Sequence, residues 1–181
     1  RAFKSRQALF SFMEFYEVIK RRRSVRSYKR DPIPEEVLNR ILEAGRLAPS
    51  AKNLQPWRFL VIRDREIIER LVPAMRNQRF IAEAPILLGV VALEKEAWGR
   101  MGGYWASYPV DCAIALEHII LAATAEGLGT CWIGAYDEKE VAKILNLKEG
   151  EKPIAFTPLG YPKELPQERG RKSFSEVVRY I

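Results

Sequence analysis

The chain has 181 residues and a mass of 20.8 kDa, the size of one domain with enough residues for a sizeable core. Hydrophobic residues make up 48% of it and charged residues 29%, a balance that excludes an intrinsically disordered chain. Much of the net charge of +7 comes from residues 1–30, and such an excess is weak evidence of a nucleic-acid partner.

Residues 1–12 are expected to be an extension outside the domain, either disordered or not native, because Met13 opens a stretch that reads as a natural start. The extension carries basic residues but lacks the sustained apolar core of a secretory signal. Residues 13–181 are then predicted to form a single domain. A first short helix is predicted over 14–23, where apolar residues recur at helical spacing before a basic run.

A second helix is predicted from Glu35 to about Leu47, opened by proline and acidic residues and ended by Pro49. The following elements are predicted in chain order as strand 57–63, helix 64–75, strand 84–93, helix 110–126, strand 130–135, helix 137–145 and strand 154–161. Because helices and strands do not alternate regularly, the pattern favours an α+β fold with a mixed sheet.

Two of these elements are apolar enough to be buried. The run 84–93 is nearly unbroken and predicts a central strand covered on both faces. The helix over 110–126 is apolar nearly all round, and charged residues within it argue against a membrane span. Cys112 and Cys131 belong to no C-x-x-C pair, which indicates two reduced core cysteines and a cytoplasmic protein.

Three arginines surround a serine in the segment Arg22-Arg23-Ser24-Val25-Arg26. Guanidinium groups keep their charge and donate paired hydrogen bonds to phosphate and to anionic ring edges. In an extended stretch alternate residues share a face, so Arg22, Ser24 and Arg26 are placed to converge on one ligand. The alternative is a solvated basic helix end.

A second polar segment, residues 49–57, leads into the first predicted strand. Ser50, Asn53 and Gln55 supply uncharged donors and acceptors suited to the edge of a heterocycle, although such residues also serve in plain connections. The two segments together predict a pocket for a phosphorylated, partly anionic small molecule.

Other catalytic machinery is not recognisable in the sequence. There is no P-loop, and Gly127-x-Gly129 lacks the third glycine of a dinucleotide fingerprint. The single histidine, His118, lies in an apolar helix and is more typical of a core or interface position. No catalytic residue and no metal ligand is therefore assigned, and the chemistry is expected to belong to a bound cofactor.

The motifs and their order resemble the FMN-dependent nitroreductase superfamily, in particular its short members. The resemblance covers residues 14–181 and rests on segments 22–26, 49–57, 77–85, 133–134, 159–162 and 171–178. It implies an α+β fold with a central, mostly antiparallel or mixed sheet flanked by helices. It also implies an intertwined homodimer with FMN at the interface.

By this resemblance, Arg22 and Ser24 hold the phosphate and ribityl chain of FMN, and Arg23 adds further contacts. Arg171 reaches the phosphate from the C-terminal tail, with Arg169 or Lys172 as a helper.

The same resemblance implies that Ser50 and Asn53 reach the flavin from the partner subunit. Gln78, or alternatively Asn77, faces the ring, and Ile133 and Gly134 lie close to it through backbone groups. Many larger relatives carry an acidic residue where this chain has Ile133.

Arg26 is expected near the pyrimidine side of the flavin, where a cation stabilises the negative charge of the reduced ring. The loop 94–108 is short and rich in aromatic residues. Its side chains, with Tyr108, are expected either to line the acceptor side by stacking or to pack at the dimer core.

The sequence thus predicts an oxidoreductase in which NADH or NADPH reduces FMN, and the electrons then pass to a nitroaromatic, quinone or similar acceptor in a ping-pong cycle. Three alternatives stay open: a flavin-dependent reductive dehalogenase or flavin-modifying relative on the same fold, a flavin-storing protein, and a basic nucleic-acid-binding module that uses residues 1–30.

Overall fold

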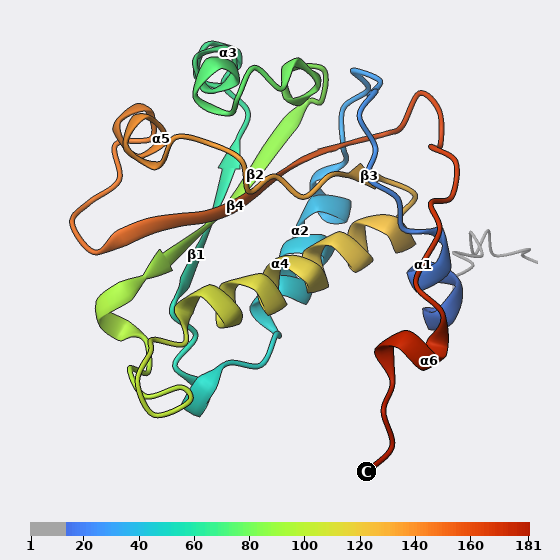
Figure 1. The fold of residues 1–181 in the computed structure, drawn as a ribbon. Coiled ribbons are helices and arrows are strands. Elements are labelled where there is room, and N and C mark those ends of the chain that lie inside the picture. Colours follow the sequence, from blue (N-terminus) through green and yellow to red (C-terminus); the bar gives the residue numbers. More distant parts are fainter. Residues whose placement is uncertain (1–13) are drawn as a thin grey trace, which may run out of the picture.

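A four-stranded antiparallel sheet organises the computed structural model, which describes residues 14–181 (Figure 1). The expected extension over residues 1–12 lies outside the described residues. The strand order is β1-β2-β4-β3, so the two longest strands are central. The strands are β1 (Trp57–Ile62), β2 (Ile86–Leu93), β3 (Gly129–Thr130) and β4 (Glu151–Gly160).

Six α-helices and three short 3₁₀ turns are found among residues 14–181. The α-helices are α1 (Phe15–Arg21), α2 (Glu35–Arg46), α3 (Arg65–Ala74), α4 (Tyr108–Ala125), α5 (Glu138–Ile144) and α6 (Phe174–Val177). The 3₁₀ turns are η1 (Ala51–Asn53), η2 (Arg79–Ala82) and η3 (Glu94–Glu96). Asp64 and Asp137 cap α3 and α5 by accepting hydrogen bonds from backbone N–H groups in the first turn.

Strand β2 carries one hydrophobic core on each face of the sheet, because successive side chains of a strand point to opposite faces. Its residues Ile86, Leu88 and Val90 pack with α2 and α4, whereas Leu87 packs with α3 and α5 on the other face. Figure 1 shows these two helix pairs on opposite sides of the sheet. The predicted central strand is thus confirmed.

Helix α4 is the longest helix of the described chain and the centre of the larger core. Its buried residues contact α2 and the sheet, and Gly45 of α2 lets the helices approach so closely that a Cβ there would lie 2.6 Å from Ile119. By length and composition alone α4 would suffice to cross a membrane, but the surroundings of its buried residues are those of a core helix.

The arginine-rich segment after α1 is an extended ribbon attached to the edge of the sheet. Ser24 forms a parallel bridge with Thr130, and the N–H of Val25 donates to the Thr130 carbonyl at 2.8 Å. Further along, the fully buried Tyr28 pairs with Pro162 and donates its hydroxyl to the carbonyl of Val25 at 2.6 Å. The ribbon is therefore fixed at both of its ends.

The elements of the sheet were largely predictable, with one difference. The predicted strand over 130–135 is only two residues long, because the N–H of Cys131 donates to the side-chain oxygen of Thr157 at 3.0 Å instead of continuing the ladder. Pairing resumes only at an isolated bridge between Ile133 and Phe156. Cys112 and Cys131 are buried and not disulfide-bonded, as predicted.

Candidate functional site

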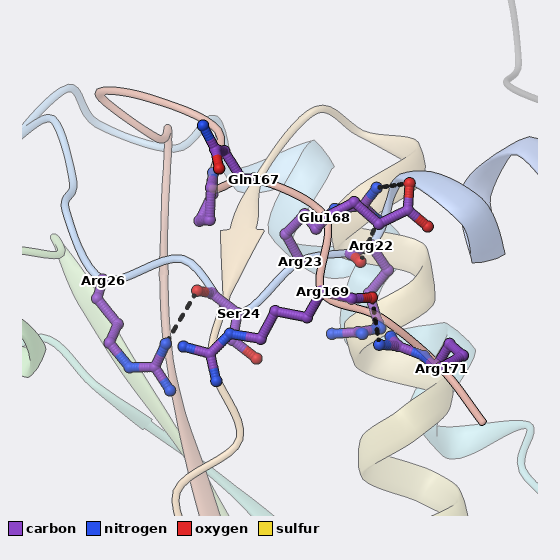
Figure 2. A pocket seen from close by; sticks show the side chains of 9 residues that line it. Arg22, Arg23, Ser24, Arg26, Gln167, Glu168, Arg169 and Arg171 are labelled. Carbon is purple, nitrogen blue, oxygen red and sulfur yellow. Dashed lines mark hydrogen bonds and ion pairs between the residues drawn. The ribbon is translucent and has the colours of Figure 1, made fainter.

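A cavity of about 180 Å³ opens where the arginine ribbon meets the C-terminal tail (Figure 2). The ribbon contributes Arg22, Arg23, Ser24 and Arg26, and the tail contributes residues 166–169 together with Arg171. Val25, between these ribbon residues, is buried on the opposite face, which is the alternation that the sequence predicted for an extended stretch. The structure thus brings Arg22, Ser24 and Arg26 around one space.

Five guanidinium groups line this cavity against one carboxylate, that of Glu168. Glu168 forms an ion pair with Arg23 at 3.3 Å, which leaves the other arginines without an acidic partner inside the cavity. In Figure 2 the side chain of Arg169 extends across the cavity toward Ser24. The guanidinium of Arg171 instead donates to the carbonyl oxygens of Arg169 and Gly170, at 3.1 and 3.2 Å.

Next to the arginine cavity, further predicted site residues lie between the ribbon and η2. Arg26 donates to the carbonyl of Ser24 at 3.4 Å, and its guanidinium lies 5.8 Å from the centre of the Phe80 ring. Gln78, two residues before Phe80, donates its side-chain amide to the carbonyls of Met75 and Ala135, at 2.9 and 3.2 Å. Arg26 therefore lies beside η2, the turn that Gln78 precedes, and both belong to the predicted set of site residues.

The segment from β3 to Gly134 runs alongside these residues. Ile133 is buried, and both its N–H and its C=O are hydrogen-bonded to Phe156, at 2.8 and 3.0 Å. Gly134 is exposed. Of Ile133 and Gly134, it is therefore the residue whose backbone groups a ligand can reach. Burial raises the pKa of the nearby Cys131 thiol, although Arg26, Ser24 and Arg22 act in the opposite direction.

Ser50 and Asn53 lie at the other end of the molecule from the arginine cavity. Their turn, η1, is attached to the first turn of α4, where the N–H of Ala51 donates to Asp111 at 2.9 Å. The ribbon is attached to Thr130, just beyond the last turn of the same helix. With 18 residues, α4 is about 27 Å long at the usual rise per residue. One protomer therefore does not bring the two predicted halves of the site together.

The turn η1 is held in an unusual backbone conformation. Lys52, Asn53 and Gln55 all have φ between 52° and 56°, the left-handed region that favours glycine. The N–H of Gln55 donates to the hydroxyl of Ser50 at 2.9 Å and closes the turn. Left-handed non-glycine residues persist only where the surroundings fix them, and such residues concentrate at functional sites.

Two residues that hold η1 in place escaped the sequence reasoning. Asp111 is only 3% exposed, and its second oxygen accepts a hydrogen bond from the hydroxyl of Ser107 at 2.7 Å. In the sequence Asp111 is one of the charged residues that interrupt the apolar helix over 110–126. An acidic residue at the start of an apolar helix is a signal of a buried carboxylate. Such a carboxylate needs hydrogen-bond donors from another segment of the chain.

The aromatic loop before α4 lies beside η1. The ammonium group of Lys52 lies 5.6 Å from the centre of the Trp98 ring. Tyr104 and Trp105 are 85% and 38% exposed, whereas Tyr108 packs against the core of α2 and α4. Tyr108 therefore packs in the core of its own chain, while the two roles expected of the aromatic loop, stacking on the acceptor and packing at the dimer core, stay predictions.

Metal binding and the single histidine are the other features of residues 14–181 that bear on catalysis. No cluster of three or more potential metal ligands is found there. His118 lies in α4, with its Nδ1 3.2 Å from the carbonyl oxygen of Ala44. The donor set of the arginine cavity instead fits an anionic group such as a phosphate, which prefers several guanidinium donors.

Comparisons with known proteins agree with the fold and the motif order. The sequence model of the nitroreductase family matches residues 19–86 and 74–161. An NADH dehydrogenase of Thermus thermophilus is 35% identical over 189 residues, with 87% of this chain and 91% of the relative covered. Among solved structures, a nitroreductase family protein of Clostridium difficile is 29% identical with a TM-score of 0.85, over 93% of this chain and 98% of the other.

The chain therefore belongs to the nitroreductase family and is an oxidoreductase enzyme. Its fold, an antiparallel sheet with helices on both faces, is the predicted α+β class.

Relatives of similar identity carry out different reactions. An iodotyrosine deiodinase of Thermotoga neapolitana is 30% identical, with 91% of this chain and 96% of the relative covered. A 5,6-dimethylbenzimidazole synthase of Rhodospirillum rubrum is 32% identical, with 79% of each chain covered. An FMN-dependent nitroreductase of Clostridium difficile has a TM-score of 0.76 at 27% identity, over 90% of this chain and 96% of the other.

Proposed function

We propose that this enzyme binds FMN and transfers electrons from NADH or NADPH to a small conjugated acceptor, such as a nitroaromatic or a quinone. The observation that carries the proposal is the cavity in which five guanidinium groups face one carboxylate. The FMN-dependent nitroreductase among the structural relatives supports the choice of cofactor. When bound, FMN would supply the two-electron chemistry, with NAD(P)H as donor and the acceptor as its second substrate in a ping-pong order.

In this proposal the arginine ribbon binds the phosphate end of FMN. Arg22, Ser24 and Arg169 supply donors from both sides of the cavity, and Arg23 and Arg171 complete the positive surroundings. Arg26 lies next in line toward Phe80, where its charge would stabilise an anionic reduced ring and raise the reduction potential. Gln78 and the backbone of Gly134 supply uncharged groups for the ring edge.

We infer that the working unit is a homodimer, because Ser50 and Asn53 can meet the arginine cavity only from a second copy. The separation along α4 within one protomer supports this inference. The C-terminal tail supports it as well, since Phe174, Val177 and Tyr180 are 69%, 63% and 86% exposed. Such apolar side chains along an extended segment are suited to packing on a partner.

The cofactor assignment is tested by purifying the protein and by titrating the apoprotein with FMN. The expected result is a yellow protein that releases FMN on denaturation and whose flavin is bleached anaerobically by NADH or NADPH. Arg22→Ala should weaken FMN binding by about tenfold or more, since a hydrogen bond to a charged group contributes about 1.5–3 kcal/mol. Arg70→Ala, at an exposed position of α3, is the matched control and should bind as the wild type does. Colourless protein that does not take up FMN would contradict the proposal.

Reductive dehalogenation is a second candidate, favoured by the identity to the iodotyrosine deiodinase. Turnover of a panel that includes nitroaromatics, quinones and halogenated phenols separates the two reactions, and the preferred acceptor is the one with the highest kcat/KM. Binding of nucleic acid is disfavoured, because the described basic residues of the ribbon line a cavity that a small anion would fill.

A further inference from the structure

The turn η1 and the aromatic loop form one rigid unit at the start of α4. Ser107 joins them, because its hydroxyl donates to Asp111, which holds η1, and its N–H donates to the carbonyl of Trp98 at 2.8 Å. Figure 1 shows the turn before β1 and the loop before α4 next to each other at that end of the molecule. The position of Lys52 relative to Trp98 is therefore fixed by backbone and buried hydrogen bonds.

Lys52 is a cation without an acidic partner. It is exposed, and no salt bridge between Lys52 and a carboxylate is found in the part of the chain that the structure describes. Its ammonium group lies 5.6 Å from the Trp98 ring centre, a cation–π arrangement that holds the charge beside an aromatic surface. The backbone of Lys52 lies in the left-handed region, at a φ of 52°, which is strained for a residue with a side chain.

Two further aromatic side chains belong to the same loop. Gly102 and Gly103, at φ of 58° and 89°, form a tight turn that is closed by hydrogen bonds between Met101 and Trp105. The turn leaves Tyr104 and Trp105 exposed. Ring faces next to an ammonium group match a planar aromatic molecule that carries a negative charge.

We propose that Lys52 and Trp98 form the acceptor subsite and that the enzyme prefers aromatic acceptors bearing a carboxylate. This inference rests on the proposed function, in which Ser50 and Asn53 reach the flavin of the partner subunit. Lys52 lies between these two residues in the turn, so its charge would then face the acceptor. The carboxylate binds at the ammonium group of Lys52, and the ring packs along the indole of Trp98.

The reduction itself needs no additional reactant. A nitroarene accepts two electrons and two protons and becomes a nitrosoarene with loss of one water. NAD(P)H supplies the two electrons and one proton as a hydride equivalent, and the second proton comes from solvent. Lys52 binds the substrate and takes no part in bond making.

The test compares 4-nitrobenzoate with 4-nitrobenzamide, which share the ring and the nitro group and differ in charge. We expect wild-type enzyme to show the higher kcat/KM with 4-nitrobenzoate. Lys52→Gln should lower that value by about tenfold, equivalent to about 1.4 kcal/mol, while changing the value for 4-nitrobenzamide less than about twofold. Lys52→Arg keeps the charge and should retain most of the preference. Lys143→Gln, which removes one exposed lysine from α5 on the far side of the sheet, is the control for net charge.

Ligand binding gives a readout that does not depend on turnover. Calorimetric titration of the FMN-loaded protein with benzoate and with benzamide should show tighter binding of benzoate, and Lys52→Gln should remove that difference. Added salt should weaken benzoate binding more than benzamide binding, because exposed charges are screened. The loss of preference in Lys52→Gln together with its retention in Lys52→Arg would support the proposal.

Two negative results are distinguishable. If wild-type protein binds FMN and oxidises NAD(P)H with ferricyanide, but Lys52→Gln affects both nitro compounds equally or neither, the acceptor subsite is wrong and the proposed function stands. If wild-type protein neither binds FMN nor oxidises NAD(P)H, the proposed function fails and the subsite fails with it.

Discussion

Arg23 and Glu168 form an ion pair at 3.3 Å that joins the arginine ribbon to the C-terminal tail. Arg23 also donates to the carbonyls of Lys20 and Arg22, so its guanidinium is fixed from several sides. The pair places a carboxylate in a cavity whose other charged lining residues are arginines. Glu168 therefore competes with an incoming phosphate for one of the donors.

Glu168→Gln is expected to strengthen FMN binding by about 1.4- to fivefold, because an exposed ion pair contributes about 0.2–1 kcal/mol. The affinity is measured by quenching of FMN fluorescence on titration of the apoprotein. Glu164→Gln, an exposed tail position outside the cavity lining, is the control and should leave the affinity unchanged. Weaker binding by Glu168→Gln would instead mean that the pair is needed to position the tail.

Asp111→Ala is expected to destabilise the protein by about 2–4 kcal/mol, because it leaves the N–H of Ala51 and the hydroxyl of Ser107 without their acceptor. Urea denaturation measures the change as a lower midpoint. Asp111→Asn keeps one carbonyl oxygen for Ala51 and should lose less than half as much. Equal losses in the two variants would argue that the charge, and not the pair of hydrogen bonds, matters.

Gly129→Ala tests the contact between β3 and the arginine ribbon. A Cβ at Gly129 would lie 2.9 Å from the Cβ of Val25, a branched side chain that cannot rotate away. We expect a loss of about 1–3 kcal/mol in stability and weaker FMN binding, since Ser24 would move with Val25.

The matched control for Gly129→Ala is Gly99→Ala, where a Cβ meets nothing within 4 Å; it should change stability by less than about 0.5 kcal/mol. Adding Val25→Ala to Gly129→Ala should recover part of the loss, because the two side chains share one space. Strictly additive losses would show that the two positions do not interact.

The two cysteines should resist thiol reagents in the folded protein. Burial, with a smaller contribution from Asp111, raises the pKa of Cys112 to about 12, and burial also raises the pKa of Cys131. A raised pKa means that the reactive thiolate forms only at higher pH, so labelling at about pH 8 should be slow. Reaction with a chromogenic disulfide is followed before and after unfolding in urea. Rapid labelling of both thiols in the native protein would contradict this expectation.

The sequence by itself was sufficient for the fold class and for most elements. The apolar run 84–93 indicated a strand covered on both faces, and the alternation around Val25 placed Arg22, Ser24 and Arg26 on one side. Periodicity of this kind depends only on neighbouring residues in the chain. It can therefore be recognised without knowing which elements pack together. The order of the motifs also indicated the nitroreductase family, and the comparisons show that the chain belongs to it.

Tertiary structure decided what local pattern cannot encode. The short β3 depends on Thr157, 26 residues from Cys131, and the anchoring of η1 depends on Asp111, 60 residues from Ala51. The separation of Ser50 from the arginine cavity follows from the length of α4, and the neighbourhood of Lys52 and Trp98 from a shared attachment to Ser107. Each of these relationships joins residues distant in the chain, and packing and buried hydrogen bonds, not spacing, bring them together.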